Sequence, residues 1–176
     1  MLIGLCGPAG CGKTTIAEWL RDHRGFKIVC FADPLYDAIS VITGIPVEGL
    51  KDRAKKEAEI PGLGRSPRFL LQTLGTDWGR DMVNSDIWVQ AAMARSGDDE
   101  DVVMADVRFD NEAAAIQARG GQVFYVVRPG WRCLEPDQAS HSSERGIDIA
   151  RIAGYIDNSG TVDQAAANLL ETIIQR

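Results

Sequence analysis

Apolar positions along the chain fall into two patterns that alternate with each other. Short continuous apolar runs, typical of buried parallel strands, cover 1–6, 27–32, 102–105, 122–127 and 155–157. Between them, apolar residues recur at helical spacing over 15–24, 34–43 and 111–119, in helices that start near 66 and 85, and over 162–174. Strands that alternate with helices predict a three-layer α/β domain built on a parallel sheet.

The turn between the first strand and the first helix carries a phosphate-binding motif. Its residues, Gly7-Pro8-Ala9-Gly10-Cys11-Gly12-Lys13-Thr14, match G-x-x-x-x-G-K-[ST] at every fixed position. The glycines let successive N–H groups turn toward phosphate oxygens, and Lys13 and the helix N-terminus add positive charge. The Thr14 hydroxyl is placed to ligate Mg²⁺. The alternative is a glycine-rich turn whose lysine is merely solvated.

Composition narrows the class of protein. The chain has 176 residues, of which 45% are hydrophobic and 25% charged, and this fits one globular domain over 1–176. No apolar stretch approaches the length of a membrane span, so we expect a soluble cytoplasmic protein without a membrane partner. A net charge of −6 and a pI near 4.9 argue against binding of a nucleic-acid polymer. Small anions remain candidate ligands.

Positive charge is concentrated between 51 and 68, a segment that contains six basic residues and three acidic ones. Much of this segment belongs to 44–64, which is rich in Pro and Gly and which we expect to be an irregular, mobile excursion rather than core. A solvated helix face with mixed charges is the alternative for 51–59. Arg68, at the head of the helix that Ser66-Pro67 starts, is less well explained that way, and it shares a face with Gln72.

Charged side chains follow two further strands. In open parallel sheets, ligands bind beyond the carboxyl ends of the strands. Asp33 follows the second strand and is a candidate for a substrate hydroxyl, with a helix N-cap as the alternative. Asp106 follows the third strand as the acidic residue of a Walker B segment would, and Arg108 comes two residues later. The alternative for Arg68 and Arg108 is pairing with surface aspartates.

The stretch 128–146 has no core periodicity and carries several arginines. Long connections of this kind in compact domains are often functional. We expect a lid whose Arg128 and Arg132 stabilise charge on phosphates, with a plain surface loop as the alternative.

Seven segments together resemble the bacteriophage deoxynucleoside monophosphate kinases. They are the phosphate-binding loop, F-A-D-P-L at 31–35, L-Q-T-L-G-T-D-W-G-R at 71–80, D-V-R-F-D-N-E at 106–112, R-P-G at 128–130, H-S-S-E at 141–144 and D-N-S-G-T at 157–161. The resemblance spans nearly the whole chain. It implies a P-loop NTPase fold with a lid, and we expect a five-stranded parallel sheet of order 2-3-1-4-5 with helices on both faces.

The resemblance also implies ATP-dependent phosphorylation of a deoxynucleoside monophosphate to the diphosphate, with Mg²⁺. The small nucleotide is then the partner, a homodimer is left open, and the location is the host cytoplasm if the source is viral. Combined with the motifs, this gives four groups of site residues: Lys13, Arg108, Arg128 and Arg132 for catalysis; Ala9, Gly10, Cys11, Gly12, Lys13, Thr14, Thr15, Asn158, Gly160 and Thr161 for ATP; Asp33, Arg68, Gln72, Trp78, Arg80, Arg108, His141 and Glu144 for the acceptor; and Thr14 with Asp106 for the metal.

Other functions fit parts of the pattern. A GTP-binding switch would need an N-K-x-D segment after a late strand, and 158–160 lacks its lysine and aspartate. A non-catalytic nucleotide-binding module would keep the loop without an acceptor site. A small-metabolite kinase, such as one that acts on dephospho-coenzyme A, also has an Asp after its second strand.

Overall fold

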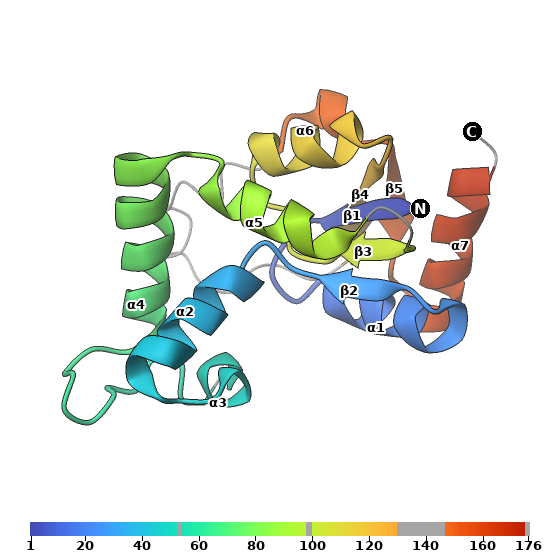
Figure 1. Cartoon of the computed structure of the whole chain (residues 1–176). Coiled ribbons are helices and arrows are strands. Elements are labelled where there is room, and N and C mark those ends of the chain that lie inside the picture. Colours follow the sequence, from blue (N-terminus) through green and yellow to red (C-terminus); the bar gives the residue numbers. More distant parts are fainter. Residues whose placement is uncertain (53, 98–99, 130–146, 175–176) are drawn as a thin grey trace. The chain divides into compact units, whose positions relative to one another are not determined.

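The computed structural model describes residues 1–52, 54–97, 100–129 and 147–174 (Figure 1). The chain forms two compact units, which are described separately. The first comprises Met1–Cys30 with Arg95–Arg176, and the second comprises Phe31–Ala94. The expectation of one domain over 1–176 stays a prediction. No helix in the described part of the chain is long and apolar enough to cross a membrane.

The first unit is built on a five-stranded parallel sheet. Its strands are β1 (Leu2–Cys6), β2 (Lys27–Val29), β3 (Val102–Met104), β4 (Gln122–Val127) and β5 (Gly154–Asp157). They lie in the order β2-β3-β1-β4-β5, and every neighbouring pair is parallel. The predicted sheet and its order are confirmed.

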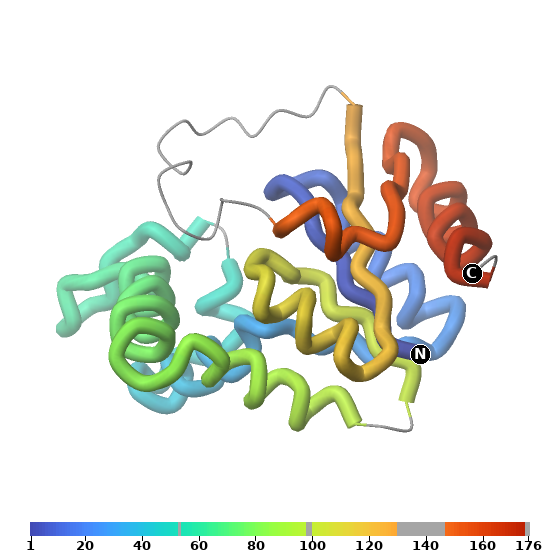
Figure 2. Tube along the Cα trace, turned by 90° about the horizontal axis from the view of Figure 1, so that it is seen from above, coloured from blue at the N-terminus to red at the C-terminus, as the bar shows by residue number. Residues whose placement is uncertain are grey.

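Alternate residues of the central strand β1 face the two helical layers. Ile3 and Leu5 are buried in a cluster with residues of α1 (Lys13–Arg24) and α7 (Val162–Ile174), which lie next to each other in Figure 2. Between them, Gly4 faces the other side, where α6 (Asp110–Ala118) packs (Figure 1). A Cβ added to Gly4 would lie 2.7 Å from Cδ1 of Ile116 in α6. Helices therefore cover both faces, with α6 approaching β1 closely enough to require glycine.

The parallel sheet brings the chemically active segments of the first unit to one edge. The phosphate-binding loop follows β1, Asp106 follows β3, Arg128 follows β4 and Asn158 follows β5. After β3 ends, the N–H of Val107 still donates to the Leu5 carbonyl at 3.3 Å, which keeps this segment beside the end of β1. The edge at which open α/β sheets bind ligands is thus lined by four segments far apart in sequence.

The second strand is shorter than its apolar run predicted. β2 ends at Val29, whose partner Met104 is the last residue of β3, so the strand ends where its neighbour ends. Phe31 is still buried, and Ala32 is already the N-cap of α2 (Asp33–Thr43). Since α2 begins at Asp33 and no side chain caps it, the N-cap interpretation of Asp33 is wrong.

The second unit contains α2, α3 (Val47–Lys51), α4 (Pro67–Gln72), the π-helix η1 (Thr73–Val83) and most of α5 (Ile87–Ser96). The predicted start of α4 is confirmed, because the Ser66 hydroxyl accepts the N–H of Phe69 at 3.3 Å. α4 then runs directly into η1, which apolar spacing did not predict. The η1 carbonyl of Gly75 accepts the indole N–H of the buried Trp88 at 2.8 Å.

Residues 44–64 are more ordered than the sequence predicted. Val47–Lys51 forms α3, and Leu50 is fully buried against Tyr36 and Ile39 of α2. The expectation that this stretch is irregular and outside the core is therefore wrong at α3. Most of the Pro and Gly residues that suggested an excursion lie on either side of this short helix, although Gly49 lies within it, and the helix was too short to show a period.

We expect Leu50→Ala to lower the free energy of unfolding by about 2–4 kcal/mol, because it would leave a cavity in a cluster that cannot fully collapse. Urea denaturation would measure the loss. Leu63→Ala is the matched control, since Leu63 is 47% exposed, and it should cost less than about 0.5 kcal/mol. Equal effects for the two variants would mean that 44–64 contributes no core.

Candidate active site

The phosphate-binding loop has the backbone that its glycines predicted. The φ angles of Gly7, Gly10 and Gly12 are +128°, +78° and +104°, all in the region that disfavours side chains. A Cβ on Gly7 would also lie 2.7 Å from the Val126 carbonyl oxygen of β4. α1 begins at Lys13 with no side-chain cap on its first turn, so its N-terminal N–H groups are left for a ligand.

Lys13 lies folded over this loop. Its ammonium donates to the carbonyls of Gly7 and Pro8 at 2.7 and 2.8 Å and to Sγ of Cys11 at 3.7 Å. Burial lowers the pKa of Lys13 because it disfavours the charged form, and the positive charge of Arg108 lowers it further. The acceptors around Lys13 are neutral, so its charge is available to a bound anion.

The D-N-S-G-T segment has structural roles at this edge. Asn158 Nδ2 donates to the carbonyl of Cys11 at 2.8 Å. Thr161 exchanges hydrogen bonds with Gln164, which accepts the Thr161 N–H at 3.0 Å and donates its own N–H to the Thr161 hydroxyl at 3.3 Å. This capping box starts α7. The structure thus brings Asn158 to the loop, whereas contacts of Asn158, Gly160 and Thr161 with a nucleotide stay a prediction.

Thr14 and Asp106 are the residues expected to hold Mg²⁺. Thr14 is in the first turn of α1, and Asp106 lies two residues past β3, the strand that pairs with β1. Both therefore lie at the same edge, with the oxygen ligands that Mg²⁺ prefers. Within the described residues no three His, Cys, Asp or Glu side chains gather as a metal site. A site of one carboxylate and one hydroxyl fits a metal held mainly by the phosphates of its nucleotide.

Arg108 is held by a residue that sequence reasoning missed. Glu112 is only 2% exposed, and its Oε2 accepts the backbone N–H of Arg108 at 2.7 Å and of Phe109 at 3.1 Å. These bonds fix the backbone from which the Arg108 side chain departs. A Glu three residues after an N-cap is a recognised pattern, but here the N-cap is Phe109 rather than Ser or Thr.

The predicted acceptor residues Asp33, Arg68, Gln72, Trp78 and Arg80 all lie in the second unit. Asp33 accepts a hydrogen bond from Lys51 at 3.0 Å. Arg68 forms an ion pair with Glu57. This partner is acidic, but it is not one of the aspartates (Asp77, Asp81 or Asp110) that the surface-pair alternative named. Arg80 donates to the Ser85 carbonyl at 3.2 Å, and Gln72 is the last residue of α4.

A cluster of lysines around Tyr36 was not predicted. The ammonium groups of Lys51 and Lys56 lie 5.1 and 5.9 Å from the centre of the Tyr36 ring, and Lys56 also donates to the Tyr36 hydroxyl at 3.2 Å. The N–H of Arg68 donates to the carbonyl of Lys56 at 3.0 Å. Two lysines therefore lie against the Tyr36 ring, and one of them, Lys51, also pairs with Asp33.

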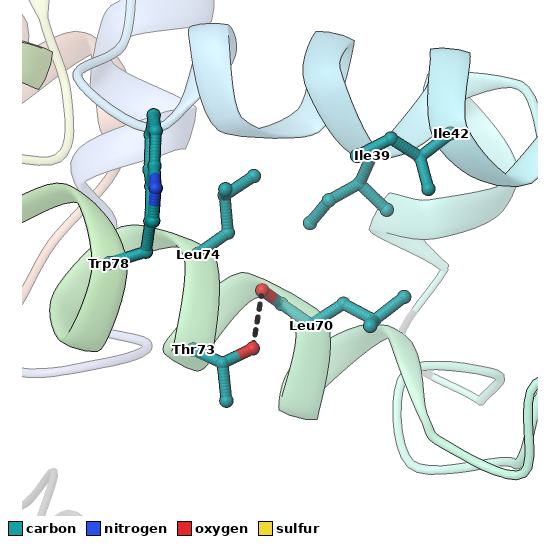
Figure 3. Close-up of a pocket in the computed structure, with 6 residues that line it drawn as sticks. All are labelled: Ile39, Ile42, Leu70, Thr73, Leu74 and Trp78. Carbon is teal, nitrogen blue, oxygen red and sulfur yellow. Dashed lines mark hydrogen bonds between the residues drawn. The ribbon is translucent and has the colours of Figure 1, made fainter.

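The second unit also contains an apolar pocket of about 270 Å³ (Figure 3). Its walls come from α2 on one side and from α4 and η1 on the other, and they consist of Ile39, Ile42, Leu70, Thr73, Leu74 and Trp78. The Thr73 hydroxyl already donates to the carbonyls of Phe69 and Leu70. Trp78 is 44% exposed and is the one predicted acceptor residue in this lining.

The predicted lid is largely outside the described residues. Arg128 is described, as an exposed residue directly after β4. Arg132, His141 and Glu144 lie outside the described residues.

Comparisons with known proteins agree with this geometry. The sequence model of the family described as deoxynucleotide monophosphate kinase matches residues 64–169. A protein of Acanthamoeba polyphaga mimivirus named as a putative deoxynucleotide monophosphate kinase is 30% identical over 98% of this chain and 96% of its own length. The deoxynucleoside-5'-monophosphate kinase of Escherichia phage T5 is 28% identical over 66% of this chain and 72% of its own. Shikimate kinase from Aquifex aeolicus shares the fold, with a TM-score of 0.53 at 11% identity over 99% and 97% of the two chains.

Proposed function

This chain belongs to the deoxynucleotide monophosphate kinase family, and from that premise we propose that it transfers the γ-phosphoryl group of ATP to the phosphate of a deoxynucleoside monophosphate. The observation that carries the proposal is the phosphate-binding loop, over which the half-buried Lys13 lies with its Nζ bonded to the carbonyls of Gly7 and Pro8. Asp33, Arg68, Gln72, Trp78 and Arg80 of the second unit stay the proposed acceptor residues. Arg108 stays a proposed catalytic residue of the first unit.

The reaction needs no covalent intermediate with the protein. An oxygen of the acceptor phosphate attacks the γ-phosphorus in line, and the bond from that phosphorus to the ADP oxygen breaks. The acceptor oxygen is already ionised, so no strong general base is needed. Lys13 and Arg108 hold positive charge where negative charge must be stabilised in the transition state. Thr14 and Asp106 would hold Mg²⁺, which supplies further neutralisation of the phosphates when bound.

The acceptor would be held by three kinds of contact. The apolar pocket beside Trp78 suits the face of a nucleobase, which stacks on aromatic rings. The guanidinium of Arg68 would donate two parallel hydrogen bonds to two oxygens of the monophosphate. Asp33 would accept a hydrogen bond from the sugar hydroxyl, held in place by Lys51.

A coupled assay with ATP, Mg²⁺ and a panel of acceptors tests this function. The panel contains the four common deoxynucleoside monophosphates, their ribose counterparts and dephospho-coenzyme A. We expect turnover with at least one deoxynucleoside monophosphate and none with dephospho-coenzyme A. A folded protein that binds ATP but phosphorylates no monophosphate would overturn the proposal and favour a non-catalytic nucleotide-binding module.

Arg68→Lys should raise the KM for the monophosphate about tenfold, while the KM for ATP stays within about threefold. The reason is that lysine offers a point charge in place of a bidentate fork. Steady-state kinetics that vary each substrate separately would measure both constants.

Two matched variants give the controls for Arg68. Arg65→Lys alters an exposed arginine that stacks on Phe69, and it should leave both constants unchanged. Glu57→Gln removes the ion-pair partner of Arg68. If Glu57→Gln reproduces the effect of Arg68→Lys, Arg68 acts through its ion pair and does not grip the acceptor.

The sequence also left a homodimer open and placed the protein in the cytoplasm, within an infected cell if its source is viral. Sedimentation equilibrium with and without ATP tests the first. Fractionation of expressing cells tests the second.

A further inference from the structure

Asn158 joins the tip of the phosphate-binding loop to the sheet. Its backbone N–H donates to the carbonyl of Val127, the last residue of β4, at 2.7 Å, which anchors it just past β5. Its side-chain amide crosses to the loop and donates to the carbonyl of Cys11 at 2.8 Å. Asn158 is half-buried, so this bond is only partly exposed to competing water.

The Cys11 carbonyl belongs to the same planar peptide unit as the N–H of Gly12. In a trans peptide these two groups point in opposite directions. A bond that draws the carbonyl outward toward Asn158 therefore turns the Gly12 N–H the other way, toward the phosphates that the loop binds. We propose that Asn158 is a positioning residue for the donor phosphates, which holds the Cys11–Gly12 peptide in its binding orientation.

Gly12 shows how closely the two segments must approach. A Cβ at position 12 would lie 2.1 Å from Nδ2 of Asn158, and the Gly12 φ of +104° disfavours any side chain. The glycine thus serves both the turn of the loop and the space for the Asn158 amide. The inference concerns the loop alone and is independent of which monophosphate is the acceptor.

Inorganic tripolyphosphate is the probe that isolates this role, because it carries the phosphates of ATP without adenine or ribose. We expect Asn158→Ala to raise the inhibition constant of tripolyphosphate and the KM for ATP about tenfold each, the order of one hydrogen bond. The KM for the monophosphate should stay within about threefold. Asn158→Asp has the same size but lacks the donor, and it should weaken the binding of tripolyphosphate at least as much. Ser159→Ala is the matched control and should change neither constant.

Three outcomes would overturn the proposal. A contact with adenine alone predicts a raised KM for ATP with an unchanged inhibition constant for tripolyphosphate. A purely structural role predicts a lowered unfolding midpoint with both constants unchanged.

An NMR titration of the wild-type protein tests the same point without a variant, because the chemical shift of the Gly12 amide proton must change on addition of tripolyphosphate. An unmoved Gly12 resonance would also overturn it. Wild type that binds tripolyphosphate but phosphorylates no monophosphate would contradict only the proposed function.

Discussion

Lys13→Ala is expected to lower kcat at least about 100-fold while the protein stays folded. The Lys13 ammonium is bonded to the carbonyls of Gly7 and Pro8 and to the thiol of Cys11, and it therefore lies at the loop to which we assign the donor phosphates. Loss of one such charge from a preorganised site costs about 10²–10³ in turnover. Its aliphatic stem contributes little to the core, because Lys13 is only half-buried. Circular dichroism with steady-state kinetics would measure fold and turnover together.

The control for this prediction is another lysine of the same unit. Lys27, at the start of β2, pairs with Glu100 at 2.9 Å and is half-exposed. Lys27→Ala should change kcat by less than about twofold. A folded Lys13→Ala enzyme with near-normal turnover would falsify the assignment of the donor site to this loop.

The sheet could be predicted because its information is local. The strands β1 to β4 lie in largely apolar runs between turns, and a buried parallel strand needs little else. The short β5, Gly-Tyr-Ile-Asp, is partly exposed and ends in Asp157. The end of β2 could not be found in this way, since Phe31 is buried without being paired in the sheet, and an apolar run reports burial rather than strand pairing. The π-helix η1 was missed for a related reason. Its widened turn gives Trp88 an acceptor in the Gly75 carbonyl, a contact between residues thirteen apart.

The same distinction separates the site residues that were predicted from those that were not. The phosphate-binding loop is one continuous segment whose spacing is fixed by the geometry of phosphate binding. The lysines around Tyr36 come from positions 15 and 20 residues later in the chain, and only the folded unit brings them together. Glu112 was missed although it is only four residues from Arg108. The capping-box pattern is recognised by a Ser or Thr at the N-cap, and here the N-cap is Phe109, which has no side-chain oxygen.

Arg108→Ala should lower kcat about 10³-fold, the lower end of what an arginine on transferring phosphates contributes. Arg108 follows β3 at the edge of the sheet where the loop with Lys13 follows β1, and its positive charge lowers the pKa of Lys13, so the two cations lie at the same edge. Arg108→Lys should retain part of the turnover and raise the KM for the monophosphate, with the KM for ATP within about threefold. Pre-steady-state and steady-state kinetics with each substrate varied would measure these effects.

Glu112 provides the internal check on Arg108. Glu112→Gln keeps the side-chain shape but weakens the acceptor of two part-buried N–H bonds, so we expect about a tenfold loss of kcat. If Glu112 acts through Arg108, the double variant Arg108→Ala with Glu112→Gln should be no slower than Arg108→Ala alone. Asp110→Asn is the matched control. It alters a carboxylate that lies between Arg108 and Glu112 in sequence but pairs with Arg151, and it should leave kcat within about threefold. Losses that multiply in the double variant would mean that Glu112 supports the fold rather than the orientation of Arg108.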